Sequence, residues 1–112
     1  MEYTQYEDDW EGYRVYTGEH VEATVQILEG GEDAYIERID VEEGFRGQGI
    51  VTDAIHEIAG DFRRVFSAPD SEDSARLYAR LGEKIVGEGA EGFVPHESLY
   101  YLDQGFGVYE VA

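Results

Sequence analysis

Residues 46–51, Arg-Gly-Gln-Gly-Ile-Val, combine one fixed positive charge with two glycines separated by a single residue. Glycine permits backbone conformations that turn successive N–H groups toward one point, and an amphipathic run follows directly. The free N–H groups of a helix N-terminus also attract anions. The pattern therefore predicts a loop that binds an anion, most simply a phosphate. The alternative interpretation is a glycine-rich turn that only connects a strand to a helix.

The elements around this loop are predicted by changes of hydrophobic period. Residues 34–41 alternate as in a strand, whereas from Gly49 to Gly60 the apolar residues recur at helical spacing. In the predicted strand one face carries Tyr35, Glu37, Ile39 and Val41, and the other carries Ile36, Arg38 and Asp40.

The rest of the chain predicts an α+β fold. Two alternating segments before residue 34 read as a hairpin, and the first eleven residues as a short strand or a lead-in. The other predicted elements are strands at Tyr13–Thr17, Val21–Leu28, Val65–Ala68 and Lys84–Val86, a helix from Asp70–Ser74 to Gly82, and one or two strands in Leu99–Leu102 and Gly107–Val111. The order is β-β-β-α-β-α-β-β, a mixed, mostly antiparallel sheet of six to seven strands with two helices. The helix between the third and fourth strands implies one parallel pair. At 112 residues we expect a single domain, 1–112.

The charge balance is the second strong signal. Asp and Glu number 26 against 8 Lys and Arg, which gives a net charge of −18, and Lys84 is the only lysine. Such a surface repels itself in dilute buffer, but at molar salt the Debye length falls to about 3 Å and the repulsion is screened. The composition is typical of a salt-rich cytoplasm, as in haloarchaea, or of a haloviral particle. An acidic interaction protein from an ordinary cell is the alternative.

Other classes of function are disfavoured. The chain has no cysteine, and its three histidines are isolated, so we expect no disulfide and no metal site. Arg63-Arg64 is the only adjacent basic pair, which argues against a nucleic-acid partner. No apolar run reaches membrane-spanning length, and the first residues lack the pattern of a signal peptide. We therefore expect no membrane partner and a cytoplasmic location.

The order strand, Arg-Gly-x-Gly-Ile, helix resembles the acyl-CoA pyrophosphate loop of the GNAT acetyltransferase superfamily. Residues 67–82 resemble the family's strand, polar cap and helix ending Leu-Tyr-x-x-Leu-Gly. The resemblance covers residues 13 to about 111 and is strongest over 34–82. The chain departs from the family at Val51, where glycine or alanine is usual, and at Glu83, where phenylalanine is usual.

The resemblance implies a binding site for acetyl-CoA, the co-substrate. Val41 would pair its backbone with the pantetheine arm, and Ser71 stands where an asparagine usually helps to fix the cofactor. The pyrophosphate would be held by backbone N–H groups of the loop and by one nearby side chain, that is by Gly47, Gln48, Gly49, Ile50 and Val51 together with Arg46.

The resemblance also implies two catalytic residues. A lysine-type amine has a pKa of about 10.4, so acyl transfer requires its deprotonation. Glu37 lies in a strand similar to that of glucosamine-phosphate acetyltransferases and would act as general base. Tyr78 stands at the tyrosine that commonly protonates the departing thiolate. Without the resemblance, Glu37 reads as one more solvated acid and Tyr78 as a core aromatic.

The leading expectation is acetyl transfer to an unidentified primary amine by direct attack on the thioester. Typical family members begin with a strand and two helices that build the acceptor wall, and only about a dozen residues precede Tyr13 here. A catalytically silent GNAT-fold assembly protein is therefore the alternative, as a homo-oligomer or a larger assembly with Tyr3, Tyr6 and Trp10 buried against a neighbouring chain. A regulatory domain that binds acyl-CoA without turnover is a third interpretation. A Val51 side chain turned away from an open cleft would favour the enzyme.

Overall fold

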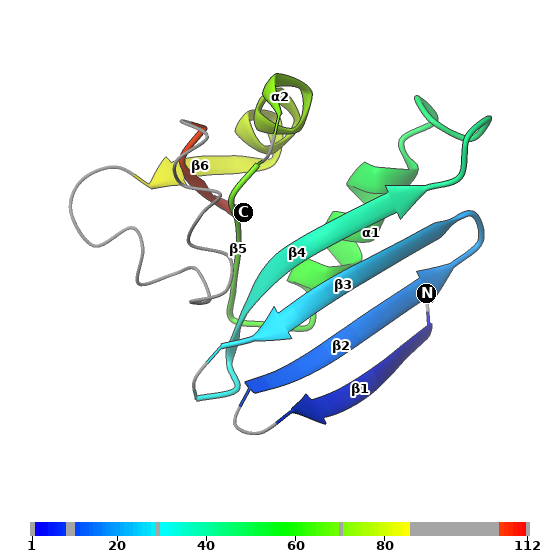
Figure 1. Ribbon diagram of the computed structural model, residues 1–112. Coiled ribbons are helices and arrows are strands. Elements are labelled where there is room, and N and C mark those ends of the chain that lie inside the picture. Colours follow the sequence, from blue (N-terminus) through cyan, green and yellow to red (C-terminus); the bar gives the residue numbers. More distant parts are fainter. Residues whose placement is uncertain (1, 9–10, 29, 70, 86–105, 112) are drawn as a thin grey trace.

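The computed structural model describes residues 2–8, 11–28, 30–69, 71–85 and 106–111 (Figure 1). Its elements are β1 (Glu2–Asp8), β2 (Glu11–Gly18), β3 (Val21–Ile27), β4 (Asp33–Val41), α1 (Ile50–Ala59), β5 (Arg64–Ser67), α2 (Glu72–Leu81), β6 (Gly82–Ile85) and β7 (Val108–Val111). All seven strands belong to one sheet in the order β1-β2-β3-β4-β5-β7-β6. The described part of the chain is α+β with two helices, as predicted.

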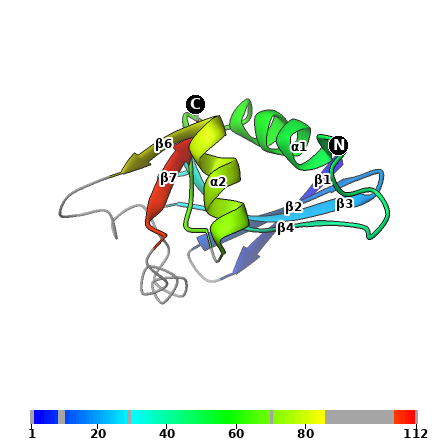
Figure 2. The same ribbon diagram turned by 90° about the horizontal axis from the view of Figure 1, so that it is seen from above.

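The sheet is mixed. Strands β1 to β4 form an antiparallel meander, β5 pairs with β4 in parallel, and β7 pairs antiparallel with both β5 and β6. The parallel pair across α1 confirms the predicted crossover. In Figure 2 both helices lie on the same side of the meander, and Ile55 of α1 and Tyr78 of α2 belong to one core cluster. No helix among the described residues is long and apolar enough to span a membrane.

The number of strands before the first helix differs from the predicted order. The prediction had three, whereas the structure has four, because Glu2–Asp8 pairs with Glu11–Thr17 as an edge strand. An edge strand takes its hydrogen bonds from one neighbour only, so its sequence needs no regular apolar alternation, and this one has none. The predicted strand at Leu99–Leu102 lies outside the described residues, as does Trp10.

A β-bulge at Glu37 corrects the predicted faces of β4. Thr24 pairs with Arg38 and Val25 pairs with Ile36, so Glu37 has no partner on β3. One extra residue reverses the alternation of side chains beyond it. Ile36 and Ile39 consequently both pack into the core beneath the helices, where the uninterrupted alternation had placed them on opposite faces. Tyr35 belongs to a separate cluster with Phe66 and Val108.

A partly buried hydrogen bond lies at the edge of the core beneath α1. Tyr16, 1% exposed, donates its hydroxyl hydrogen to Asp61 Oδ2 at 2.8 Å. Burial is the main cause that raises the pKa of Tyr16 to about 12, and the carboxylate of Asp61 adds to it. This contact joins β2 to the turn that follows α1.

Candidate functional site

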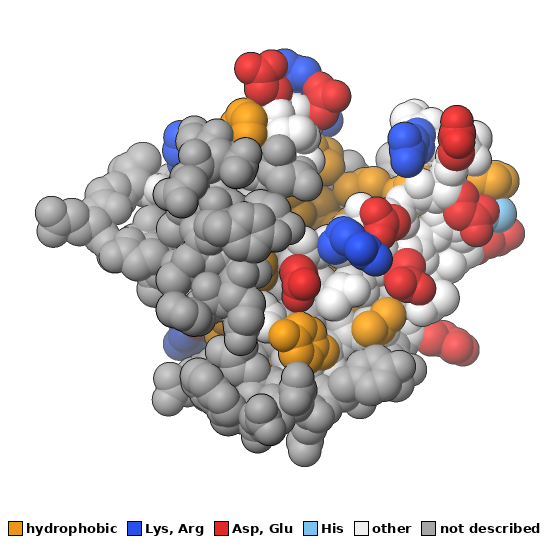
Figure 3. Space-filling model, viewed as in Figure 1, with side chains coloured by type: hydrophobic (Ala, Val, Ile, Leu, Met, Phe, Trp, Pro, Cys, Tyr) orange, Lys and Arg blue, Asp and Glu red, His pale blue; other side chains and the backbone are white. Residues whose placement is uncertain are grey.

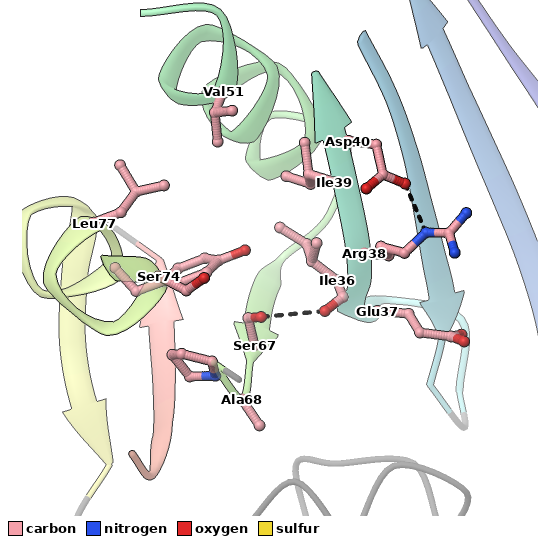
Figure 4. Close-up of a pocket in the computed structure, with 12 residues that line it drawn as sticks. Ile36, Glu37, Arg38, Ile39, Asp40, Val51, Ser67, Ala68, Ser74 and Leu77 are labelled. Atoms are coloured by element: carbon pink, nitrogen blue, oxygen red, sulfur yellow. Dashed lines mark hydrogen bonds and ion pairs between the residues drawn. The ribbon is translucent and has the colours of Figure 1, made fainter. Parts of the chain in front are cut away.

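Strands β4 and β5 separate soon after they begin to pair. Their ladder joins Asp33–Tyr35 to Arg64–Phe66 and goes no further among the described residues. Beyond it, Ser67 Oγ donates a hydrogen bond to the carbonyl oxygen of Ile36 at 3.2 Å. A pocket of about 230 Å³ opens at this separation (Figure 4), lined by Ile36, Glu37, Arg38, Ile39, Asp40, Val51, Ser67, Ala68, Pro69, Ser74, Leu77 and Tyr78.

The β4 residues that line this pocket lie on both faces of the strand. In Figure 4, Ile36 and Ile39 point toward the helices, whereas Glu37 and Arg38 point to the other side of the strand. Glu37 is exposed. Arg38 and Asp40 form an ion pair at 2.7 Å on that other side. The carboxylate predicted as general base therefore lies on the sheet face opposite the helices.

Tyr78 lines the pocket from α2. It is 7% exposed, and its ring centroid lies 6.4 Å from that of Tyr109. The side chain thus belongs to the core and to the wall of the pocket at once, so the two interpretations of Tyr78 do not exclude each other.

A second pocket, of about 300 Å³, lies beside the first. It is lined by Val41, Phe45, Arg46, Gly47, Gly49, Ile50, Val51, Thr52, Leu77 and Arg80. Val51 and Leu77 line both pockets, so the two adjoin there. Six of the residues predicted to bind the cofactor thus meet in one pocket, and the two predicted catalytic residues line the next.

The glycine loop (residues 42–49) turns at three glycines before α1 begins. Gly44, Gly47 and Gly49 have positive φ angles of 96°, 78° and 79°, which other residues rarely adopt. Gly49 is the N-cap of α1 and has no side chain with which to cap its first N–H groups. Arg46 lies nearby, with Nε 3.5 Å from the carbonyl oxygen of Val41. The N-terminus of a helix with an arginine nearby favours an anion.

The pairing of the arginines adds a second electrostatic argument. Five of the seven arginines form ion pairs with carboxylates, namely Arg14, Arg38, Arg63, Arg64 and Arg76. Arg46 and Arg80 form none with any described residue, and both line the second pocket. The chain has 26 acidic residues, yet these two arginines have no carboxylate partner among the described residues and line the same pocket. Their positive charges favour an anionic ligand there.

Two predicted residues lie outside both linings. Gln48 is exposed in the glycine loop. Ser71 is the N-cap of α2, where its Oγ accepts the backbone N–H of Ser74 at 3.1 Å. That hydroxyl satisfies the helix end and does not line either pocket.

Sequence reasoning did not assign several of the lining residues to a site, and four of them are polar or join the two pockets. Ser67 and Ser74 line the first pocket, Arg80 lines the second, and Leu77 lines both. Helical spacing could have predicted Arg80, because it follows Leu77 by three residues and therefore lies on the same side of the helix. Ser67 had no such signal, because its place depends on where β4 and β5 separate.

No group of three side chains among the described residues is arranged to hold a metal ion. The charged and phenolic side chains that line the two pockets are Glu37, Arg38, Asp40, Arg46, Tyr78 and Arg80. In comparisons with known proteins, no family model, curated protein or solved structure matches this chain.

Proposed function

We propose that the chain is an N-acyltransferase with a GNAT-like fold that moves an acetyl group from acetyl-CoA to a primary amine. The observation that carries the proposal is the junction of the two pockets at Val51 and Leu77. It joins a pocket lined by Arg46, Arg80 and the N-terminus of α1 to a pocket lined by Glu37 and Tyr78.

Cofactor binding would use the second pocket. Backbone N–H groups of residues 47–51 would hold the pyrophosphate, with Arg46 on one wall and Arg80 on the other. The pantetheine arm would run along the edge of β4 near Val41, which lies beyond the last β5 partner. The acyl group would thereby reach the first pocket.

In the transfer step the amine nitrogen attacks the thioester carbonyl, so that an N–C bond forms and the C–S bond breaks. Glu37 would take the proton that the amine loses, and Tyr78 would give one to the departing sulfur. A backbone N–H near Val41 would stabilise the oxyanion. Because Glu37 points away from the helices, the amine would approach from the opposite face of the sheet (Figure 4).

Calorimetric titration with acetyl-CoA, in about 2–3 M KCl to screen self-repulsion, tests the binding step. We expect micromolar affinity, weakened about 10- to 100-fold by Arg46→Ala or Arg80→Ala, since a hydrogen bond to a charged group is worth roughly 1.5–3 kcal/mol. Gly49→Trp should abolish binding. Arg76→Ala is the matched control, because Arg76 is on the same helix but pairs with Asp73. No binding up to millimolar acetyl-CoA by the folded protein would contradict the proposal.

Turnover separates the enzyme from an acyl-CoA-binding regulatory domain. Thiol release should be measured with a panel of primary amines. We expect Glu37→Gln and Tyr78→Phe to lower the rate about 10²- to 10⁴-fold, the range of general acid–base catalysis, while acetyl-CoA affinity stays unchanged. Binding without turnover of any amine would favour the regulatory domain.

One observation favours a catalytically silent assembly protein as the second candidate. Figure 4 shows the Val51 side chain directed into the gap between α2 and β4, and Val51 lines both pockets. A branched side chain at the junction narrows the passage between the pockets. If acetyl-CoA does not bind, this candidate, as a component of a haloviral particle or a host complex, takes precedence.

We further propose that the chain works in molar salt. Figure 3 shows acidic side chains spread over the described part of one face rather than gathered in a single patch. The net charge of −18 then supports a salt-rich environment better than a single acidic binding site. The urea midpoint of unfolding should rise steadily between 0.1 and 3 M KCl. A midpoint that falls or stays constant would contradict this proposal.

A further inference from the structure

The tip of the β2–β3 hairpin contacts the glycine loop through one side chain. The imidazole of His20 stacks on the ring of Phe45, with centroids 3.5 Å apart and an interplanar angle of 8°. His20 Nδ1 lies 2.8 Å from Glu42 Oε2, and the Glu42 N–H donates to the His20 carbonyl oxygen at 2.9 Å. Figures 1 and 2 both show this hairpin tip beside the end of β4.

These contacts reach the glycine loop, whose own residues do little to fix a single backbone conformation. Within the loop, the Phe45 N–H donates to the Glu42 carbonyl oxygen at 3.1 Å. Three of its eight residues are glycines with positive φ, which lose the most conformational freedom on ordering. A ring stack from outside the loop therefore contributes strongly to the choice of one loop conformation.

Phe45 connects this stack to the second pocket. It lines that pocket together with Arg46 and Gly47, its next two neighbours in the chain. The His20 ring therefore holds Phe45, the residue directly before Arg46 and Gly47, in place. A shift of Phe45 would move Arg46 and the N–H groups that follow.

The backbone of His20 permits a clean substitution. With φ at 67°, His20 is the one non-glycine residue with positive φ among the described residues. Asparagine adopts this conformation readily, so His20→Asn keeps the turn and removes the stacking ring.

We propose that His20 is a positioning residue for the anion site: it holds the glycine loop in its binding conformation before the ligand arrives. The inference rests on the proposed function for the identity of the ligand, acetyl-CoA. Its physical basis is preorganisation, because a loop ordered in advance loses less entropy on binding. The stack on Phe45 is the contact through which His20 would order the loop.

The test compares His20→Asn with His56→Asn in about 2–3 M KCl. His56 is exposed on α1 and lines neither pocket, so it controls for the loss of a histidine. We expect amide hydrogen exchange at residues 44–49 of the free protein to become about 3- to 10-fold faster in His20→Asn alone, as an aromatic pair worth roughly 0.5–1.5 kcal/mol implies. Acetyl-CoA affinity should fall by a similar factor, while the urea midpoint stays unchanged.

A second variant distinguishes the stack from the hydrogen bond. Phe45→Leu should reproduce the effect of His20→Asn, and the double variant should be no worse than either single variant. Additive effects of the two substitutions on exchange would overturn the proposal. So would unchanged exchange in His20→Asn, or a fall in its urea midpoint large enough to explain the exchange.

The exchange measurement needs no ligand. If wild-type protein does not bind acetyl-CoA, the proposed function fails, yet exchange still decides whether His20 orders the loop. If wild-type protein binds and His20→Asn binds equally well, the proposed function stands and the role of His20 is refuted.

Discussion

The Ser67 hydroxyl and the Ile36 carbonyl oxygen are joined by a hydrogen bond of 3.2 Å, one residue beyond the last pair of the β4–β5 ladder. Where the backbone ladder ends, a hydrogen bond from a side chain thus joins the two strands. Ser67 is 5% exposed, so this contact is shielded from water. Both residues line the first pocket.

Replacing Ser67 by alanine should therefore destabilise the fold. The Ile36 carbonyl would lose a buried partner, at a cost of about 1–3 kcal/mol in the free energy of unfolding. Urea unfolding in molar KCl measures this, with exposed Thr17→Ala on β2 as a control that should change little. A Ser67→Ala protein as stable as the wild type would show that the contact does not hold the strands.

Val51→Ala should widen the junction between the pockets. We expect acetyl-CoA to bind several-fold more tightly, because the branched side chain no longer narrows the passage. The same change should lower stability by about 1 kcal/mol, since Val51 packs against two core clusters. Calorimetry and urea unfolding measure the two effects separately. Unchanged affinity would show that Val51 does not restrict the ligand.

Ser71→Ala should affect stability and not ligand binding. Loss of this N-cap is expected to cost about 1 kcal/mol, and Ser71→Gly only a few tenths. Acetyl-CoA affinity should stay within twofold of wild type, because Ser71 lines neither pocket. A marked loss of affinity in both variants would instead support the cofactor contact that the family resemblance implies.

Gly82→Ala should destabilise the protein through a steric clash. A Cβ atom at Gly82 would overlap the carbonyl oxygen of Glu110 on β7, and the extended backbone itself requires no glycine. Overpacking of this kind costs about 1–3 kcal/mol. Gly60→Ala is the control, because the nearest backbone oxygen would lie 3.4 Å from its Cβ. Equal urea midpoints for the two variants would contradict the explanation.

Tyr16→Phe should remove the contribution of Tyr16 to the fall in the free energy of unfolding at alkaline pH. Because burial raises the pKa of Tyr16 to about 12, the fold favours the neutral phenol. Its contribution is complete below the ordinary value of 10 and is lost as the pH rises from 10 to 12. The variant should be less stable by about 1–2 kcal/mol at pH 8, through loss of the bond to Asp61, and this difference should narrow above pH 10. A difference that stays constant up to pH 11.5 would refute it.

Local sequence patterns predicted most of the elements and much of the second pocket. The glycine loop is a property of consecutive residues, because positive φ at Gly47 and Gly49 is a local demand of the turn that precedes α1. The period of α1 likewise predicted its buried residues, Ala54, Ile55 and Ile58. Helix and turn signals need no information about distant neighbours.

The faces of β4 and the partners of the site depended on the tertiary structure. The bulge at Glu37 arises from the register with β3, which no alternation within β4 reveals, and it turns Ile39 to the same side as Ile36 while Glu37 points away from the helices. That Arg80 and Arg46 line the same pocket depends on how α2 packs beside the glycine loop. The contact of His20 with Phe45 joins residues 25 positions apart. The sequence by itself determined which groups were present to bind an anion, whereas only long-range packing decided which of them share a pocket.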